Sequence, residues 1–256
     1  MRTRIILLLL AIAFTPATLA AQKITIAAAS DLKSCLDEVA ANFRKAHAGD
    51  EIEVVYGSSG KFKTQIEQGA PFDLFFSADI AFPRDLLKAN LAVGEVHPYA
   101  TGRLVLWSKT IDATTLKVAD LTRADIQKIA IANPQHAPYG ERAEEALRAG
   151  GIWEQVESKL VFGENIAQTA QFAESGNAQV GMIALSLVLG PEMAGKGSYN
   201  LVPDSLHQPL EQGFVITKRA ADNRLARAFA DYMGSQQTRA VMVRYGFALP
   251  GEASSH

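Results

Sequence analysis

The sequence predicts an α/β fold built mostly from parallel strands. Short apolar runs typical of buried strands recur along the chain, and amphipathic helical stretches alternate with them. This order favours parallel strands joined by helices. No internal repeat occurs, and no stretch rich in proline, glycine and serine divides the 256 residues. If the chain forms two lobes, it must pass between them through strands, for which 103–107 and 213–217 are the candidates. Two antiparallel crossings of this kind would form a hinge.

The first half of the chain alternates strand and helix. We expect strands at 24–28, 52–56, 72–79 and 102–109. The helices between them are expected at 32–46, directly after the turn Gly57-Ser58-Ser59-Gly60, and at 82–89.

The second half begins with a looser stretch, in which we expect a capped helix near 121–127. The order strand, loop, helix then occurs twice, at 128–151 and at 159–176. A strand running into a short helix follows at 178–190. A late strand at 213–218 precedes two closing helices, at 222–233 and 236–245.

The first 21 residues have the pattern of a secretory signal peptide. Arg2 and Arg4 precede an apolar run at 5–14, and small residues follow, including Ala20 and Ala21. The run is shorter than the roughly 20 residues that span a bilayer, so an uncleaved anchor is the weaker alternative. We expect cleavage after Ala20 or Ala21 and export of a soluble mature chain.

The mature chain is mildly acidic. Without Arg2 and Arg4 it has 23 basic and 27 acidic residues, a net charge of −4. No basic patch or basic aromatic stripe occurs, which argues against nucleic acid as a partner. The single cysteine, Cys35, cannot form an intrachain disulfide and lies in register with the apolar face of the first expected helix. We expect a buried, unreactive thiol there.

Polar groups gather where expected strands turn into helices. In open α/β sheets, ligands bind beyond the carboxyl ends of the strands. A helix N-terminus at that edge presents unpaired N–H groups and a partial positive charge, so it can bind an anion without a cation. Each serine or asparagine there could instead be an ordinary helix cap, and Tyr139 a packed aromatic. Four turns carry such donors: Ser30-Asp31, Gly57-Ser58-Ser59-Gly60, His136-Ala137-Pro138-Tyr139-Gly140 and Gly163-Glu164-Asn165-Ile166.

The sequence does not match the motifs that are typical of catalytic sites. The serine-rich turn departs from a phosphate loop, because Val55 stands where a glycine is needed and Phe62 where serine or threonine is needed. It departs from a nucleophile elbow because Ser59 meets Gly60 directly. The five histidines show no metal-ligand spacing. We expect neither an enzyme nor a directly bound metal cation. An exported hydrolase that uses Ser59 or Ser30 is a remote alternative.

Four segments together resemble a known family. They are ITIAAASDLK (24–33), YGSSGKFKTQIEQGAPFDLFFSAD (56–79), IANPQHAPYGERAEEAL (131–147) and RYGF (244–247). In their order and spacing they resemble the periplasmic molybdate-binding proteins (the ModA family) of ABC transporters, over nearly the whole chain after the signal peptide.

The resemblance implies a type II periplasmic binding protein, in which a strand hinge joins two α/β lobes and the ligand cleft lies between them. Residues 1–21 would be the signal peptide, 22–102 with 207–256 would form lobe one, and 103–206 would form lobe two.

The resemblance also implies which residues hold the oxyanion. Side chains at matching positions are Ser30 and Ser59, with Asp31 and Ser58 as their neighbours, and the matching backbone N–H groups belong to Tyr139 and Ile166. Some members of the family add a tyrosine hydroxyl at a position where this chain has Ala184. The Tyr139 hydroxyl is expected to replace it. Ser30 is also expected to cap its own helix, and the Asp31 carboxylate is expected to point away from a dianion.

By resemblance, the protein captures molybdate, and tungstate as well, and delivers it to the membrane permease of an ABC transporter. It would act as a monomer in the periplasm, with no cofactor and no nucleic acid partner. Molybdenum would be held as its oxyanion rather than as a coordinated cation. Another anion in the same fold, such as sulfate or an organic anion, is the nearest alternative.

Overall fold

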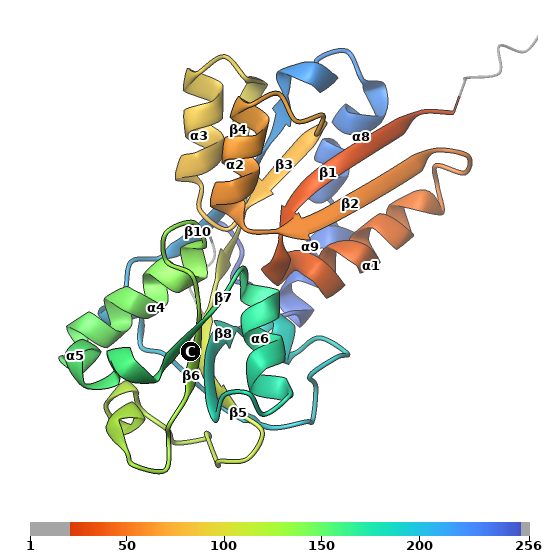
Figure 1. Cartoon of the computed structure of the whole chain (residues 1–256). Coiled ribbons are helices and arrows are strands. Elements are labelled where there is room, and N and C mark those ends of the chain that lie inside the picture. Colours follow the sequence, from red (N-terminus) through yellow and green to blue (C-terminus); the bar gives the residue numbers. More distant parts are fainter. Residues whose placement is uncertain (1–20, 252–256) are drawn as a thin grey trace, which may run out of the picture.

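The computed structural model of this chain describes residues 21–251 (Figure 1). The expected signal peptide therefore lies outside the described residues, apart from Ala21. The described chain forms two lobes, each built around one five-stranded sheet with helices packed on it. This arrangement confirms the predicted α/β class and the two-lobe architecture. None of the helices in the described range is long and apolar enough to cross a membrane.

The first lobe is built around a sheet with the strand order β2-β1-β3-β10-β4. β1 pairs in parallel with β2 and β3, so the carboxyl ends of these three strands meet at one edge. Alternate residues of the strands face two helical layers, because side chains of a strand alternate between faces. The strands are β1 (Lys23–Ala29), β2 (Glu51–Gly57), β3 (Leu74–Ser77), β4 (Ala92–Gly102) and β10 (Leu210–Thr217).

Five α-helices cover the sheet of the first lobe. Ile24, Ile26 and Leu74 pack in one buried cluster with α1, α8 and α9, whereas Ala27 and Phe75 pack in another with α2 and α3. Cys35 is buried in the first of these clusters, as expected. The helices are α1 (Lys33–Arg44), α2 (Ser59–Glu67), α3 (Ala81–Lys88), α8 (Arg224–Met233) and α9 (Gln236–Arg244).

The second lobe is built around a sheet with the strand order β7-β6-β8-β5-β9. β6 pairs in parallel with β7 and β8, while β5 runs antiparallel to β8 and β9. The strands are β5 (Leu104–Ser108), β6 (Ile129–Ala132), β7 (Leu160–Gly163), β8 (Val180–Ala184) and β9 (Ser198–Leu201), and the α-helices are α4 (Pro138–Ala149), α5 (Trp153–Val156), α6 (Ile166–Glu174) and α7 (Leu185–Val188).

The chain crosses between the lobes twice. It leaves the first sheet at Gly102 and enters the second at Leu104, and it returns between Leu201 and Leu210. Gly102 and Leu210 face each other in the antiparallel pairing of β4 with β10, so the two crossings lie side by side. The expected crossings through 103–107 and 213–217 were placed too far along the chain, because each of these strands lies within one sheet.

Both sheets are mixed rather than mostly parallel, since two of the four strand pairs in each are antiparallel. The sequence analysis missed β4 and the short β9. In β4 the buried and exposed residues do not alternate, and the strand contains Gly94 and Pro98. It lies at the edge of the sheet beside β10, which is the position where a strand tolerates proline.

The prediction of a helix near 121–127 is wrong. A short 3₁₀ helix, Val118–Thr122, stands there and ends at Arg123, whose backbone is extended. The Lys159 ammonium donates hydrogen bonds to the backbone carbonyls of Leu121, Thr122 and Arg123, at 3.2, 3.0 and 2.9 Å. A long-range contact thus satisfies the carbonyls that a longer helix would have paired internally.

Candidate functional site

A small cavity lies between the lobes, at the carboxyl ends of β1, β2, β3, β6 and β7. The space open to the centre of a water-sized sphere is about 10 Å³, so the cleft is nearly closed. All six residues predicted from the sequence line this cavity, although they come from four separate turns. The lining residues are Ala29, Ser30, Asp31, Gly57, Ser58, Ser59, Ala78, Ala137, Pro138, Tyr139 and Ile166.

Ser59 presents a hydroxyl that is free to donate. It is the first residue of α2 and is 1% exposed. Its Oγ accepts a hydrogen bond from the backbone N–H of Ala78 at 3.0 Å. That bond fixes the oxygen and leaves the hydroxyl hydrogen without an acceptor among the described residues. Buried hydroxyls normally find partners, so this hydrogen is available for an anion in the cavity.

Ser58 contacts the other lobe. Its hydroxyl donates to the backbone carbonyl of His136, and its Oγ lies 2.9 Å from Nδ1 of the same residue. Because the single hydroxyl hydrogen goes to the carbonyl, Nδ1 of the neutral imidazole must carry the proton and donate to Oγ. Ser58 therefore joins the two lobes, and its hydroxyl has no hydrogen left for a ligand.

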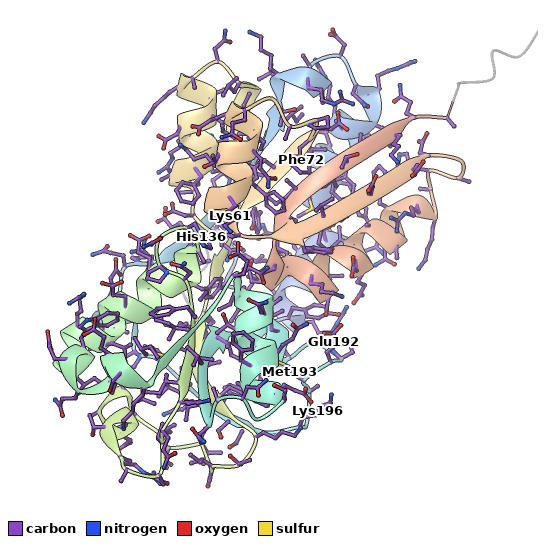
Figure 2. All side chains as sticks on the ribbon, viewed as in Figure 1. Lys61, Phe72, His136, Glu192, Met193 and Lys196 are labelled. Atoms are coloured by element: carbon purple, nitrogen blue, oxygen red, sulfur yellow. The ribbon has the colours of Figure 1, made fainter. Side chains whose placement is uncertain are left out.

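Gly60 allows the same two segments to approach closely. Its backbone N–H donates to the His136 carbonyl at 2.9 Å. A Cβ atom at this position would lie 2.6 Å from that carbonyl oxygen, which is closer than real Cβ atoms come. The final glycine of the Gly-Ser-Ser-Gly turn is thus required by the contact between the lobes. Figure 2 shows Lys61 and His136 meeting at this junction.

Ser30 does not cap its own helix, contrary to expectation. The residue before the 3₁₀ turn at Ser30–Leu32 is Ala29, and no side chain caps that turn. The Ser30 hydroxyl donates instead to Oδ1 of Asn165 at 3.1 Å and accepts from the backbone N–H of Ala167 at 3.2 Å. Serine 30 therefore reaches across the cleft to the N-terminus of α6 in the second lobe.

The second lobe contributes backbone donors. Tyr139 lies in the first turn of α4, and Ile166 is the first residue of α6. N–H groups in a first turn have no acceptor within their own helix, and these two find none elsewhere in the described chain. The Asn165 side chain caps α6 by accepting from the N–H of Gln168, which leaves the N–H of Ile166 for the cavity.

The Asp31 carboxylate is buried and points to neutral groups. Its Oδ2 accepts from Nε2 of Gln212, on β10, at 2.7 Å, and Oδ1 has no partner in the described chain. Burial raises its pKa from 3.8 to about 6, against smaller lowering contributions from Gln212, from the Tyr139 hydroxyl and from nearby backbone N–H groups. The carboxylate thus faces the junction between β10 and α4.

The Tyr139 hydroxyl belongs to this same polar group. Its oxygen accepts a hydrogen bond from Nε2 of Gln212 at 3.3 Å, and burial, followed by the negative charge of Asp31, raises the pKa of Tyr139. The hydroxyl lies against Gly102, at the crossing between the lobes. The backbone N–H of Tyr139 is therefore left for the cavity, while its hydroxyl faces Gln212 and Asp31.

Two residues near the site were not predicted. His136 lies in a segment that the sequence analysis singled out, but nothing in the sequence showed that its carbonyl would accept from Ser58 and Gly60 of the other lobe. Gln212 lies in the middle of β10 and is fully buried. No local pattern marked it, since its role depends on Asp31, which lies far away in the sequence.

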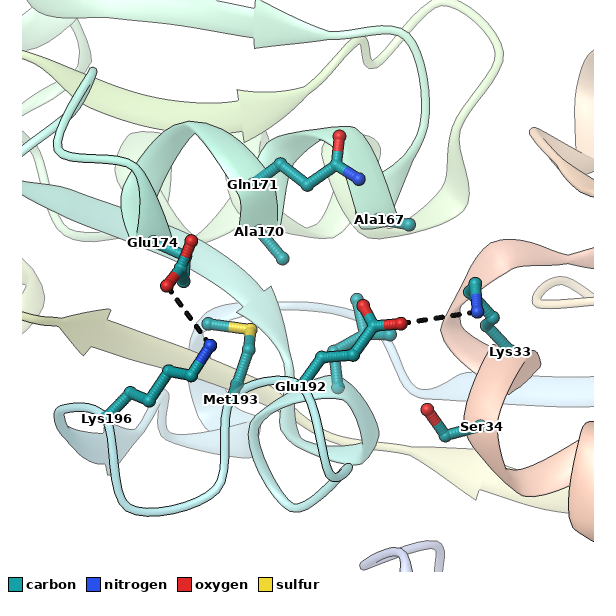
Figure 3. A pocket seen from close by; sticks show the side chains of 10 residues that line it. Lys33, Ser34, Ala167, Ala170, Gln171, Glu174, Glu192, Met193 and Lys196 are labelled. Atoms are coloured by element: carbon teal, nitrogen blue, oxygen red, sulfur yellow. Dashed lines mark hydrogen bonds and ion pairs between the residues drawn. The ribbon is translucent and has the colours of Figure 1, made fainter.

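Ion pairs join the lobes around the cavity. Lys33 pairs with Glu192 at 3.4 Å, Arg142 with Asp79 at 3.7 Å, and Lys61 with Glu164. The first pair lies at one end of a groove of about 330 Å³ between α1 and α6, shown in Figure 3. At the other end Glu174 pairs with Lys196 at 3.3 Å.

The chemistry of the cavity is that of neutral donors. Its donors are one free hydroxyl and several backbone N–H groups, supplied by both lobes. None of the described residues forms a cluster of histidine, cysteine or carboxylate side chains that could hold a metal cation. The arrangement suits an anion held by hydrogen bonds at helix N-termini.

The family of bacterial extracellular solute-binding proteins matches residues 24–248. The chain belongs to this family.

Within that class, two of its most similar relatives are molybdate-binding proteins. It is 38% identical to the molybdate-binding protein ModA of Rhodobacter capsulatus over 89% of both chains, and 36% identical to ModA of Azotobacter vinelandii over 90% of this chain and 91% of the other. Among solved structures, the periplasmic molybdate-binding protein of Azotobacter vinelandii superposes with a TM-score of 0.82 at 30% identity, covering 89% of this chain and 99% of that one. The resemblance drawn from the sequence is confirmed.

Proposed function

We propose that this protein captures molybdate in the cavity between its lobes and delivers it to the permease of an ABC transporter. The observation that carries this proposal is the cavity itself. Neutral donors from both lobes converge on it, and the chain is similar over about nine-tenths of its length to a molybdate-binding protein and shares the fold of another. Tungstate, which has the same charge and shape, is the second expected ligand.

Three groups are the expected first contacts of the oxyanion. They are the Ser59 hydroxyl and the backbone N–H groups of Tyr139 and Ile166, since each lines the cavity with a hydrogen that has no acceptor in the described chain. Hydrogen bonds to a charged group each contribute about 1.5–3 kcal/mol. The helix N-termini add favourable partial charge, so no counter-cation is needed.

Ser30, Ser58 and Asp31 support the site in other ways. The Ser30 hydroxyl bridges to α6, and on ligand binding it would exchange its bond with Asn165 for one with the anion. Ser58 holds the His136 segment in the closed position. Asp31 contributes its backbone N–H, while its side chain faces Gln212.

The lobes are expected to open and close about the paired crossings at Gly102 and Leu210. We assign 22–102 and 207–256 to lobe one and 103–206 to lobe two. A signal peptide at 1–21 would direct the chain to the periplasm, where it would act as a monomer. The closed, loaded form would dock on the permease, and opening would release the anion with no catalytic step.

A direct binding measurement tests this function. Equilibrium dialysis of the mature chain against molybdate should give one bound anion per chain. Small-angle scattering at saturation should show a smaller radius of gyration than without ligand. Absence of binding would reject the proposal. Steady turnover of generic esters by the same preparation would favour a hydrolase instead.

A further inference from the structure

We infer that Asp31 binds a proton together with the oxyanion, so that the protein captures a dianion and one hydrogen ion. This inference rests on the proposed function, since it assigns a second ligand to the same site. The proton comes from solvent and adds to the carboxylate, with no other bond made or broken.

The geometry around Asp31 lacks any positive charge. The residue is 1% exposed and lines the cavity beside Ser30. Among the described residues no lysine, arginine or histidine forms an ion pair with it. Its Oδ1 has no hydrogen-bond partner, and neither does Oε1 of Gln212, the residue that donates to its Oδ2. A proton on the carboxyl would turn one unpartnered buried acceptor into a donor.

The groups packed against Asp31 are neutral. The ionisable ones are Tyr139 from α4, Tyr99 from β4 and Cys35 from α1, and burial raises the pKa of all three. The hydroxyl of Ser186, on α7, donates to the Asp31 carbonyl at 2.8 Å. α7 has no ionisable side chain. Glu174, the one on α6, pairs with Lys196 in the groove of Figure 3 and also with Lys109.

Two further segments that end at the cavity carry ionisable groups, Tyr56 and His136. Tyr56 at the end of β2 donates to Asp37 and stays neutral because burial raises its pKa. His136 faces Ser58, Glu164 and Lys61 at the rim, and burial lowers its pKa. None of these supplies a fixed positive charge beside the Asp31 carboxylate.

A dianion in this cavity would place two negative charges next to the negative charge of the Asp31 carboxylate. Two like charges in one buried site disfavour each other, and the one that can take a proton does so. Molybdate stays ionised at neutral pH, whereas the pKa of Asp31 is already about 6 without it. Binding should raise that pKa further. Proton uptake on binding is therefore expected near neutral pH, and affinity should increase as pH falls from 8 towards 6.

The test is calorimetric titration of the mature chain with sodium molybdate in buffers of different ionisation enthalpy, none of them phosphate. The dependence of the measured heat on the buffer gives the number of protons taken up. Uptake should be greatest between the pKa of the ligand-free form, about 6, and the higher pKa of the bound form, and it should decrease at lower and at higher pH. Affinity should change by up to about tenfold per pH unit in this range.

Two variants test whether Asp31 is the group that takes up the proton. Asp31→Asn should bind molybdate with no proton uptake and with an affinity that does not change between pH 6 and 8. Asp85→Asn, an exposed carboxylate of α3 paired with Lys88, is the matched control and should behave as the wild type. If Asp31→Asn does not fold, Gln212→Met serves instead, because loss of its donor should move the pH of maximum uptake upwards.

The outcomes separate the two proposals. Molybdate binding without proton uptake in the wild type would overturn this inference and leave the proposed function intact. Unchanged uptake in Asp31→Asn would also overturn it, because the proton would then bind elsewhere. No heat of binding in any buffer would reject the proposed function, and this inference with it.

Discussion

The groove between α1 and α6 and the cavity both lie where the lobes meet, but they stabilise charged side chains in opposite ways. The groove of Figure 3 carries exposed charges: Lys33 pairs with Glu192 across the lobes, and Lys196 pairs with Glu174 within the second lobe. The cavity joins the two lobes through buried neutral groups, and its one carboxyl, that of Asp31, has no cation beside it. In the groove, hydrogen bonds from Lys196 and then Lys109 lower the pKa of Glu174. In the cavity, burial raises the pKa of Asp31 to about 6.

The contrast teaches where binding energy for an anion can come from. A fixed cation in the cavity would pair with Asp31 and would also attract any anion of any size. Neutral donors on helix N-termini attract an anion only where it reaches them, so they can discriminate by shape. The exposed pairs of the groove are screened by salt and solvent and contribute little to closure.

The largest expected effect concerns Asp31 in the ligand-free protein. A folded-state pKa of about 6 against 3.8 means that the folded protein binds this proton more tightly than the unfolded chain. The free energy of unfolding therefore falls as pH rises from about 4 to 6, and it stays at the lower value above pH 6. Asp31→Asn should raise the free energy of unfolding at pH 8 by up to about 3 kcal/mol, and by less at pH 4.5. Urea unfolding at both pH values measures this.

Glu174→Gln is the counterpart in the groove. It removes a carboxylate whose pKa is lowered by two lysines, so stability at pH 8 should stay the same or fall. If Asp31→Asn were no more stable than the wild type at pH 8, the contrast between the two carboxylates would be lost.

The next effect concerns Ser59. Ser59→Ala removes the one free hydroxyl of the cavity and should weaken molybdate binding by about 1.5–3 kcal/mol, roughly 10- to 150-fold. Ser34→Ala makes the same chemical change in the groove and should leave the affinity unchanged. Calorimetric titration of both variants decides the point. Equal affinities for Ser59→Ala and the wild type would remove Ser59 from the site.

A third variant tests the close approach of the lobes. The Cβ of Gly60→Ala would meet the His136 carbonyl, so closure must deform the backbone. Such overpacking costs about 1–3 kcal/mol, and molybdate affinity should fall by the same amount. Gly234→Ala, whose Cβ makes only an ordinary contact at 3.4 Å, is the control. Wild-type affinity in Gly60→Ala would show that the bound form is less closed at this point.

The smallest effect belongs to the groove. Lys33→Met breaks its pair with Glu192, in which the two side chains are 41% and 66% exposed. Exposed pairs of this kind contribute about 0.2–1 kcal/mol, so affinity should fall less than about fivefold. The difference from the wild type should vanish in 1 M sodium chloride, because salt screens exposed charges. A larger loss that persists in salt would give the groove a direct part in binding.

The sequence predicted the residues that line the cavity better than the topology that places them there. Ser59, Tyr139 and Ile166 were found because each stands at a strand-to-helix turn and matches the motif of a known family. The mixed sheets were missed because β4 and β10, far apart in sequence, pair only after folding. The same reason hid Gln212, His136 and the bridge from Ser30 to Asn165, since none of these contacts leaves a local pattern.

The most direct test of the central claim is a competition titration of the mature chain with molybdate, tungstate, sulfate and phosphate. All donors are neutral and fixed on two lobes, so an anion that is too small leaves donors unpaired at about 1–3 kcal/mol each. Two unpaired donors would already give a preference of several hundred-fold. We predict that molybdate and tungstate bind nearly equally and far more tightly than sulfate and phosphate. Displacement of molybdate by sulfate at comparable concentration would contradict this account.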